Sequence, residues 1–240
     1  MKLKTIVLGG IILGLAGLGF GYSRLNNLKL TNSTQTISSS SFTPTQTPQL
    51  NPGPFARMTI PYLRQQTYQS QLADLELISE NSQYSSYLTS YQSEDLKING
   101  LLTRPVGTQS ENGWPAIVFI HGYIPPKQYQ TTERYQDYVD YLARNGFVVF
   151  KIDLRGHGQS EGLTSGAYFS GDYIIDTLNA YAALENADFV NSKQISLWGH
   201  SMGGNVVLRT MAAKPEIPAG VIWAGSVFTY TDFQDYRIQD

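Results

Sequence analysis

A short apolar run that breaks into Gly-x-Ser-x-Gly and then into a helix-like segment constrains the fold of this chain more than any other feature. The run covers residues 194–198, the motif extends from Gly199 to Gly203, and helical spacing follows over residues 205–211. This order predicts a strand that reverses sharply into a helix, with Ser201 in a strained backbone conformation and its Oγ clear of the sheet. The two glycines remove side chains that would collide across so tight a turn.

A serine in such a turn, which is called a nucleophile elbow, needs a base, normally a histidine oriented by a carboxylate. In sites of this kind the chain order is serine, then aspartate or glutamate, then histidine. The sequence contains His121, His157 and His200, and none of them lies beyond the elbow. His200 is adjacent to the serine and is expected to point away from it. The sequence therefore predicts a nucleophile without its usual base in these 240 residues.

Two further buried-strand patterns also end in loop motifs. Residues 116–120 end in His-Gly-Tyr at 121–123, and residues 147–152 end in Asp-Leu-Arg-Gly-His-Gly at 153–158. Open α/β sheets bind their ligands at the edge where the carboxyl ends of parallel strands meet. We therefore expect these two loops to meet the elbow at one edge of the sheet.

Buried strands that alternate with helices after an antiparallel start predict an α/β fold, with a mostly parallel sheet and helices on both faces. The expected strands are residues 84–91, 96–104, 116–120, 147–152, 195–198 and 221–227. The expected helices are residues 135–143, the amphipathic segment 173–184, and residues 205–211. The first two strands are predicted to form a hairpin.

With these three motifs, the chain resembles the α/β-hydrolase superfamily from Tyr84 to about Phe228. The lead-in from Tyr91 to Leu102, followed by Arg-Pro at 104–105, is similar to the start of the catalytic domain of prolyl-oligopeptidase-type serine peptidases and related esterases. The resemblance implies a serine hydrolase that cleaves peptide or ester bonds through an acyl-enzyme, without a cofactor or metal. It also implies about eight strands. We expect this sequence to supply about six of them, as the N-terminal part of a domain that is truncated at its C-terminus.

The residues that match the motifs carry what the resemblance implies. Ser201 matches the nucleophile, and the backbone N–H groups of Tyr123 and Met202 match the two donors of an oxyanion hole. Roles in ordering the loops fall to the other motif residues: His121, Gly122, Asp153, Arg155 and His157. Asp153 and Arg155 are expected to pair with each other.

Two classes of function stay open at this point. The first is a serine hydrolase acting on a small ester or peptide. The second is a catalytically inactive hydrolase-like module that binds a partner or a small ester, because the triad histidine is missing and the acid is not assigned. Asp232 and Asp235 follow the last expected strand, and each is either the triad acid or the start of a solvated loop. A separately encoded C-terminal part is considered as a partner.

The N-terminus predicts a membrane-targeting segment. Lys2 and Lys4 precede a charge-free apolar stretch over residues 5–22. As a helix this stretch would span about 27 Å, close to the hydrocarbon core of about 30 Å. It is interpreted as a signal anchor that holds an extracytoplasmic domain at the membrane, or as a signal peptide within residues 1–24 that is cleaved from a secreted protein.

The rest of the chain divides by composition. Residues 25–54 are rich in Ser, Thr and Pro and are predicted to form a disordered linker. Residues 55–83 are expected to be an irregular lead-in to a hydrolase domain over residues 84–240. A net charge of −2, with 15% charged residues, argues against nucleic acid as a partner. The sequence has no cysteine, which excludes disulfides and thiolate zinc sites.

Overall fold

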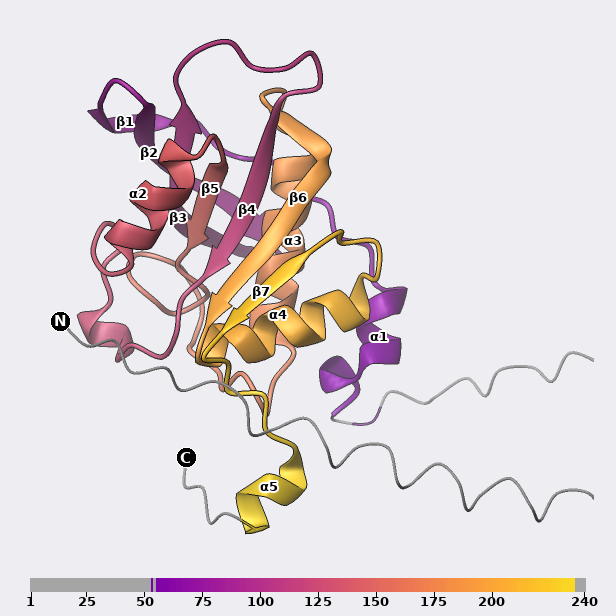
Figure 1. The fold of residues 1–240 in the computed structure, drawn as a ribbon. Helices are drawn as coiled ribbons and strands as arrows, with labels where there is room; N and C mark the ends of the chain where they lie inside the picture. Colours follow the sequence, from indigo (N-terminus) through magenta and orange to yellow (C-terminus); the bar gives the residue numbers. More distant parts are fainter. Residues whose placement is uncertain (1–52, 54, 236–240) are drawn as a thin grey trace, which may run out of the picture. The chain divides into compact units, whose positions relative to one another are not determined.

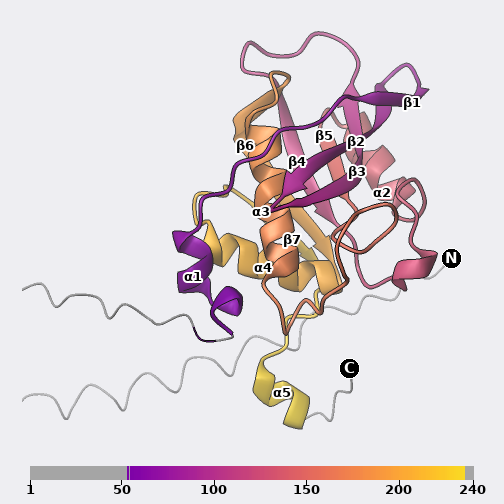
Figure 2. The same cartoon turned by 180° about the vertical axis from the view of Figure 1, so that it is seen from behind.

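The computed structural model describes Gly53 and residues 55–235, which build a seven-stranded sheet with helices on both faces (Figure 1, and from behind in Figure 2). The strands are β1 (Glu76–Glu80), β2 (Tyr84–Ser93), β3 (Leu96–Pro105), β4 (Trp114–Ile120), β5 (Val148–Ile152), β6 (Val190–His200) and β7 (Gly220–Trp223). The helices are η1 (Ala56–Met58), α1 (Ile60–Gln65), η2 (Pro126–Gln128), α2 (Gln136–Arg144), α3 (Asp172–Glu185), α4 (Met202–Ala213) and α5 (Tyr230–Asp235). The predicted α/β class is confirmed.

The sheet has the order β1-β2-β3-β5-β4-β6-β7. β2 and β3 pair antiparallel along their whole length, with Tyr84 opposite Pro105 and Ser93 opposite Leu96, so the predicted hairpin is confirmed. β3 is also antiparallel to β5, whereas β5, β4, β6 and β7 run parallel to one another. The carboxyl ends of these four strands therefore point to one edge, where α4 begins (Figure 1).

Helices on both faces bury the central strands. α3 and α4 cover one face over the larger apolar cluster, which includes Val118 and Phe150. α2 covers the other face over a smaller cluster that includes Phe119 and Val149. Each fully buried Val or Phe side chain contributes about 1.5–3 kcal/mol. This two-sided burial explains the continuous apolar run over residues 116–120 of β4, which is typical of parallel strands, and β5 is apolar except for Lys151.

The structure departs from the sequence prediction in four elements. Residues 55–83 were expected to be irregular but contain α1 and β1, so the described residues hold seven strands rather than six. All five residues of β1 are exposed, and this strand therefore lacks the apolar alternation that marks a half-buried strand. α3, expected to be amphipathic, is buried over residues 173–184. The last strand ends at Trp223 instead of residue 227, because Ala224 takes a positive φ of 45°.

No helix in the part of the chain that the structure describes is long and apolar enough to cross a membrane. The anchor or signal peptide predicted for residues 5–22 lies outside the described residues. So does the predicted linker at residues 25–54, apart from Gly53.

β7 is an exposed edge of the sheet. In the described residues it pairs with β6 alone, and all four of its residues are exposed. Val221, Ile222 and Trp223 together with Tyr138 and Trp198 border an apolar groove of about 530 Å³ between β7 and α2. An unpaired apolar edge offers a template on which other chains can pair.

Val221→Lys tests this property of β7, because a charge on an edge strand opposes pairing with another chain. We expect the variant to bind at least about twofold less of a hydrophobic dye than the wild type does, and to aggregate at least about twofold less. Its free energy of unfolding should change by no more than about 0.5 kcal/mol, as is usual for exposed positions. Val106→Lys, at a similarly exposed valine directly after β3, is the matched control. Equal aggregation of Val221→Lys and the wild type would contradict this account of β7.

Candidate active site

Ser201 lies between β6 and α4 with φ 51° and ψ −116°, a conformation that non-glycine residues rarely adopt. Its N–H donates to the carbonyl oxygen of Trp223 at 3.1 Å. Its own carbonyl oxygen accepts from the N–H groups of Gly204 and Ser226, both at 2.9 Å. These bonds hold the strained turn between the start of α4 and the segment after β7. The predicted sharp strand-to-helix turn is therefore present.

Gly199 and Gly203 permit this turn because three backbone segments meet without side chains between them. A Cβ atom on Gly199 would lie 2.3 Å from the carbonyl oxygen of Gly203. A Cβ atom on Gly203 would lie 2.4 Å from the carbonyl oxygen of Ile120, at the end of β4. The start of α4 therefore packs directly on the end of β4, from which the His-Gly-Tyr loop departs.

The two predicted oxyanion donors belong to these neighbouring loops. Tyr123 lies in the loop after β4, and Met202 is the first residue of α4. Within the described residues, neither backbone N–H donates to a protein acceptor. Both are therefore available to a ligand, and the Met202 N–H has the positive end of the α4 dipole behind it.

Gly122 and His121 hold the loop after β4 in place through contacts with neighbouring segments. The Gly122 N–H donates to the hydroxyl oxygen of Tyr135 at 2.9 Å. The His121 ring is fully buried, with Nδ1 2.7 Å from the carbonyl oxygen of Gly122 and Nε2 3.0 Å from that of Asp153. Burial lowers the pKa of His121 to about 4, so its ring is neutral at neutral pH. These contacts connect the loop after β4 to the end of β5.

The other two histidines also have partners away from the serine. His157 Nδ1 lies 3.2 Å from the carbonyl oxygen of Arg155. His200 Nδ1 lies 2.7 Å from the Tyr135 hydroxyl, so this side chain points toward α2. Among the described residues, the contact of Ser201 Oγ is with the Oγ of Ser226 at 3.5 Å, longer than an ordinary O–H···O bond. All three histidines of the sequence are thus engaged elsewhere.

Asp153 and Arg155 do not pair, contrary to expectation. The Asp153 carboxylate accepts hydrogen bonds from the hydroxyls of Tyr129 at 2.9 Å and Thr131 at 2.6 Å. Burial raises the pKa of Asp153 to about 6, against the hydrogen bonds and the nearby Lys151. Lys151 is itself fully buried, and burial lowers its pKa to about 8. Asp153 therefore holds the segment that contains Tyr129 and Thr131, which follows the loop after β4.

Arg155 instead forms a buried ion pair with Asp176 of α3, at 2.7 Å between Nη2 and Oδ1. It also lies 3.1 Å from Glu94 and 3.4 Å from Asp172, and both carboxylates contact Arg57 as well. The sequence does not predict this network, because its members are far apart in the chain and share no motif. The network fixes the loop after β5 to α3 and, through Glu94 and Asp172, connects it to Arg57 of η1.

Asp232 caps a helix. Its carboxylate accepts from the Thr229 N–H at 2.5 Å, while its own N–H donates to Thr229 Oγ1 at 3.3 Å. This reciprocal pair is a capping box at the start of α5. Asp235 lies at the end of the same helix and is exposed.

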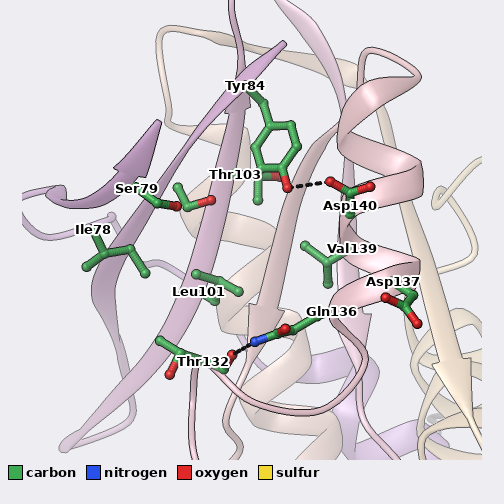
Figure 3. Close-up of a pocket in the computed structure, with 11 residues that line it drawn as sticks. Ile78, Ser79, Tyr84, Leu101, Thr103, Thr132, Gln136, Asp137, Val139 and Asp140 are labelled. Atoms are coloured by element: carbon green, nitrogen blue, oxygen red, sulfur yellow. Dashed lines mark hydrogen bonds between the residues drawn. The ribbon is translucent and has the colours of Figure 1, made fainter. Parts of the chain in front are cut away.

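A cavity of about 400 Å³ lies away from these loops, between α2 and the strands β1, β2 and β3 (Figure 3). Tyr84 donates to Asp140 across it at 2.7 Å, and Leu101 and Val139 form part of its wall. None of its lining residues belongs to the three loop motifs. Residues 55–235 also contain no cluster of His, Asp or Glu that could hold a metal ion.

The sheet, the strained serine turn after β6 and the loops after β4 and β5 define an α/β hydrolase. Residues 114–237, just over half of the chain, match the family model Hydrolase_4, described as serine aminopeptidase, S33. The chain belongs to this family of hydrolases. The superfamily suggested by the sequence is therefore confirmed.

Curated relatives and solved structures agree with this assignment. A probable dipeptidyl-aminopeptidase B from Fusarium vanettenii is 26% identical over 60% of this chain and 16% of its own length. The quorum-quenching protein AidA from Acinetobacter baumannii is 27% identical over 54% of this chain and 40% of its own. Acetyl xylan esterase 1 from Thermoanaerobacterium sp. shares the fold, with 20% identity, a TM-score of 0.52, and 75% and 64% of the two chains covered. This chain thus spans less than half the length of these two curated relatives.

Asp153→Asn tests the ionisation of the buried carboxyl group. Because the folded-state pKa of about 6 lies above the ordinary value of 3.8, the stability contributed by Asp153 is complete below that ordinary value and is lost as pH rises through about 6. Asparagine does not titrate. We therefore expect the free energy of unfolding of the variant, relative to wild type, to increase with pH from about 4.5 to about 7.5.

Urea unfolding at the two pH values measures this difference. Asp188→Asn, at an exposed aspartate, is the matched control for the loss of one negative charge. A difference between Asp153→Asn and wild type that stays constant over this pH range would show that the carboxyl group is ionised at both ends of it.

Proposed function

We propose that this protein is a serine hydrolase that cleaves an ester or peptide bond through an acyl-enzyme at Ser201. The observation that carries the proposal is the backbone of Ser201, held at φ 51° beside two N–H groups that have no acceptor in the described protein. Strain of this kind persists only where the surroundings impose it, and it concentrates at functional sites. The membership of the hydrolase family supports the same reaction class.

In the proposed reaction a base takes the hydroxyl proton of Ser201 as Oγ attacks the carbonyl carbon of the substrate. The carbonyl oxygen becomes an oxyanion that accepts hydrogen bonds from the N–H groups of Tyr123 and Met202. The protonated base then gives its proton to the departing alcohol or amine, and the acyl-enzyme is left. Water attacks this ester with help from the same base, releases the acid and restores Ser201.

We further propose that the base comes from polypeptide outside these 240 residues. His121 is buried against two carbonyl oxygens, His157 lies against a third, and His200 is bonded to Tyr135. Asp232 is similarly occupied by its capping interaction. A partner chain, or a further part of a longer protein, would therefore complete the site.

The names of the relatives support a small ester or a peptide as the substrate. One relative is named as a dipeptidyl-aminopeptidase, and a structural neighbour is an acetyl xylan esterase. Both reactions proceed through attack on an acyl carbon, and the oxyanion donors proposed here would serve either of them.

A second candidate is a non-catalytic module that binds an ester or a partner protein. The engagement of all three histidines favours it, since a serine hydroxyl without an adjacent base is a poor nucleophile. Such a module would retain the hydrolase fold without turnover.

Added imidazole discriminates between the two candidates, because it can act as an external base for a correctly placed serine. For the purified chain, we expect hydrolysis of a p-nitrophenyl ester to be slow without imidazole. With imidazole, the rate should exceed that of Ser201→Ala by about tenfold or more, which is less than the roughly 10²–10⁴-fold that a positioned general base contributes. Stopped-flow absorbance of the released nitrophenolate measures both rates.

Ser226→Ala is the matched control, because it removes the hydroxyl that lies 3.5 Å from Ser201 Oγ, in the segment after β7, without removing the proposed nucleophile. It should retain most of the imidazole-dependent rate. Equal rates for wild type and Ser201→Ala at every imidazole concentration would contradict the enzymatic proposal and favour the binding module.

A further inference from the structure

Tyr135 lies in an unusual backbone conformation between the loop after η2 and α2. It is the N-cap residue of α2, with φ 55° and ψ 14°, and Arg134 before it has φ 57°. The left-handed region is unfavourable for non-glycine residues, and here two of them occur in succession. The side chain of Tyr135 makes no cap hydrogen bond to α2, so capping does not account for this conformation.

The conformation places the Tyr135 hydroxyl between two segments that are far apart in the sequence. The Gly122 N–H can only donate, so the Tyr135 oxygen accepts its hydrogen bond at 2.9 Å. The hydroxyl hydrogen of Tyr135 is then free to be donated to Nδ1 of His200 at 2.7 Å. The result is a continuous hydrogen-bond relay, which runs from the Gly122 amide through the Tyr135 hydroxyl to the His200 ring.

The surroundings hold this relay in place. The Tyr135 ring packs edge-on against Phe119 of β4, with centroids 5.4 Å apart. Burial raises the pKa of Tyr135, so its hydroxyl stays protonated and able to donate. A Cβ atom on Gly122 would lie 2.8 Å from the Tyr135 oxygen and 2.9 Å from His200 Nδ1, so a larger residue there would have to displace these two side chains.

We propose that Tyr135 is a positioning residue that sets the separation between the two oxyanion donors. Gly122 directly precedes Tyr123, and His200 lies two residues before Met202, so the relay joins the two loops beside both donor amides. This inference rests on the proposed function. It adds that a side chain outside the three loop motifs fixes the geometry in which the transition state is bound.

The proposal makes a specific kinetic claim. Oxyanion donors act on charge that develops in the transition state, and a change in their spacing therefore lowers kcat while leaving the ground-state KM nearly unchanged. Tyr135→Phe removes both hydrogen bonds but keeps the ring that packs on Phe119. In the imidazole-assisted reaction we expect kcat to fall about tenfold or more, which is a smaller fall than the complete loss of an oxyanion donor would cause. We expect KM to change less than about twofold.

Tyr138→Phe is the matched control. It makes the same substitution one turn further along α2, at a ring that packs on Trp198 and Trp223 but whose hydroxyl has no hydrogen-bond partner among the described residues. It should leave kcat and KM unchanged. Thermal unfolding followed by circular dichroism checks that both variants are folded.

A second readout does not depend on activity. In protein labelled with 15N-histidine, the Nδ1 resonance of His200, assigned by its loss in His200→Gln, should be that of a hydrogen-bond acceptor. In Tyr135→Phe we expect this resonance to shift, and in Tyr138→Phe to stay in place. An unchanged resonance in Tyr135→Phe would overturn the relay itself.

The remaining outcomes separate the two proposals. Wild-type kcat in a folded Tyr135→Phe variant whose His200 resonance has shifted would overturn the positioning role alone. If kcat and KM both worsened to a similar degree in this variant, Tyr135 would have a general structural role and the proposal would also fail. Absence of any hydrolysis that depends on Ser201 in the wild type would overturn the proposed function, and the positioning role with it.

Discussion

The backbone contact between the start of α4 and the end of β4 is the constraint on which the rest of the site depends. A single methyl group at Gly203 would meet the carbonyl oxygen of Ile120 at 2.4 Å, so the two segments approach as closely as bare backbones allow. This approach forces Ser201 into its strained conformation and brings the first amide of α4 beside the loop that leaves β4. The local strain, about 1–3 kcal/mol for such a residue, is sustained by the burial of β4 and α4 around it.

Buried polar groups fix the positions of the loops around that contact. His121 ties the loop after β4 to the end of β5 and, being neutral, carries no buried charge. Asp153 ties the next segment through two hydroxyls, at the cost of a carboxylate whose pKa is raised by burial. The Arg155–Asp176 pair fastens the loop after β5 to α3. Removal of one partner from such a buried pair is typically expensive, about 3–5 kcal/mol.

The sequence was sufficient for those parts of the fold and site that local chemistry determines. Gly-x-Ser-x-Gly between an apolar run and a helix pattern predicted the turn at Ser201, because that backbone conformation needs glycines at fixed positions. Buried-strand patterns similarly predicted β4 and β5. The partners of Arg155 were not predictable, because Asp176 lies within a helix and meets Arg155 only through the tertiary fold.

Other elements lacked a local signal altogether. The strand β1 is exposed on both sides and therefore has no apolar period to detect. Tyr135 looked like the start of an ordinary helix, and its role depends on Gly122 and His200, which lie on two other segments. Residue type alone suggested that Asp153 and Arg155 would pair. The fold instead points them to different partners, among them Thr131 for Asp153 and Asp176 for Arg155.

The measurement that tests the central claim most directly is peptide mapping by mass spectrometry. The folded chain is first exposed to an activated acetyl ester and imidazole, and the reaction is then quenched in acid. The account predicts a single acetylated position, Ser201, and loss of that adduct when the protein is unfolded in urea before exposure. Acetylation spread over surface lysines and hydroxyls with no excess at Ser201, or the same labelling of Ser201 in the folded and unfolded chain, would contradict the claim that the fold activates this serine.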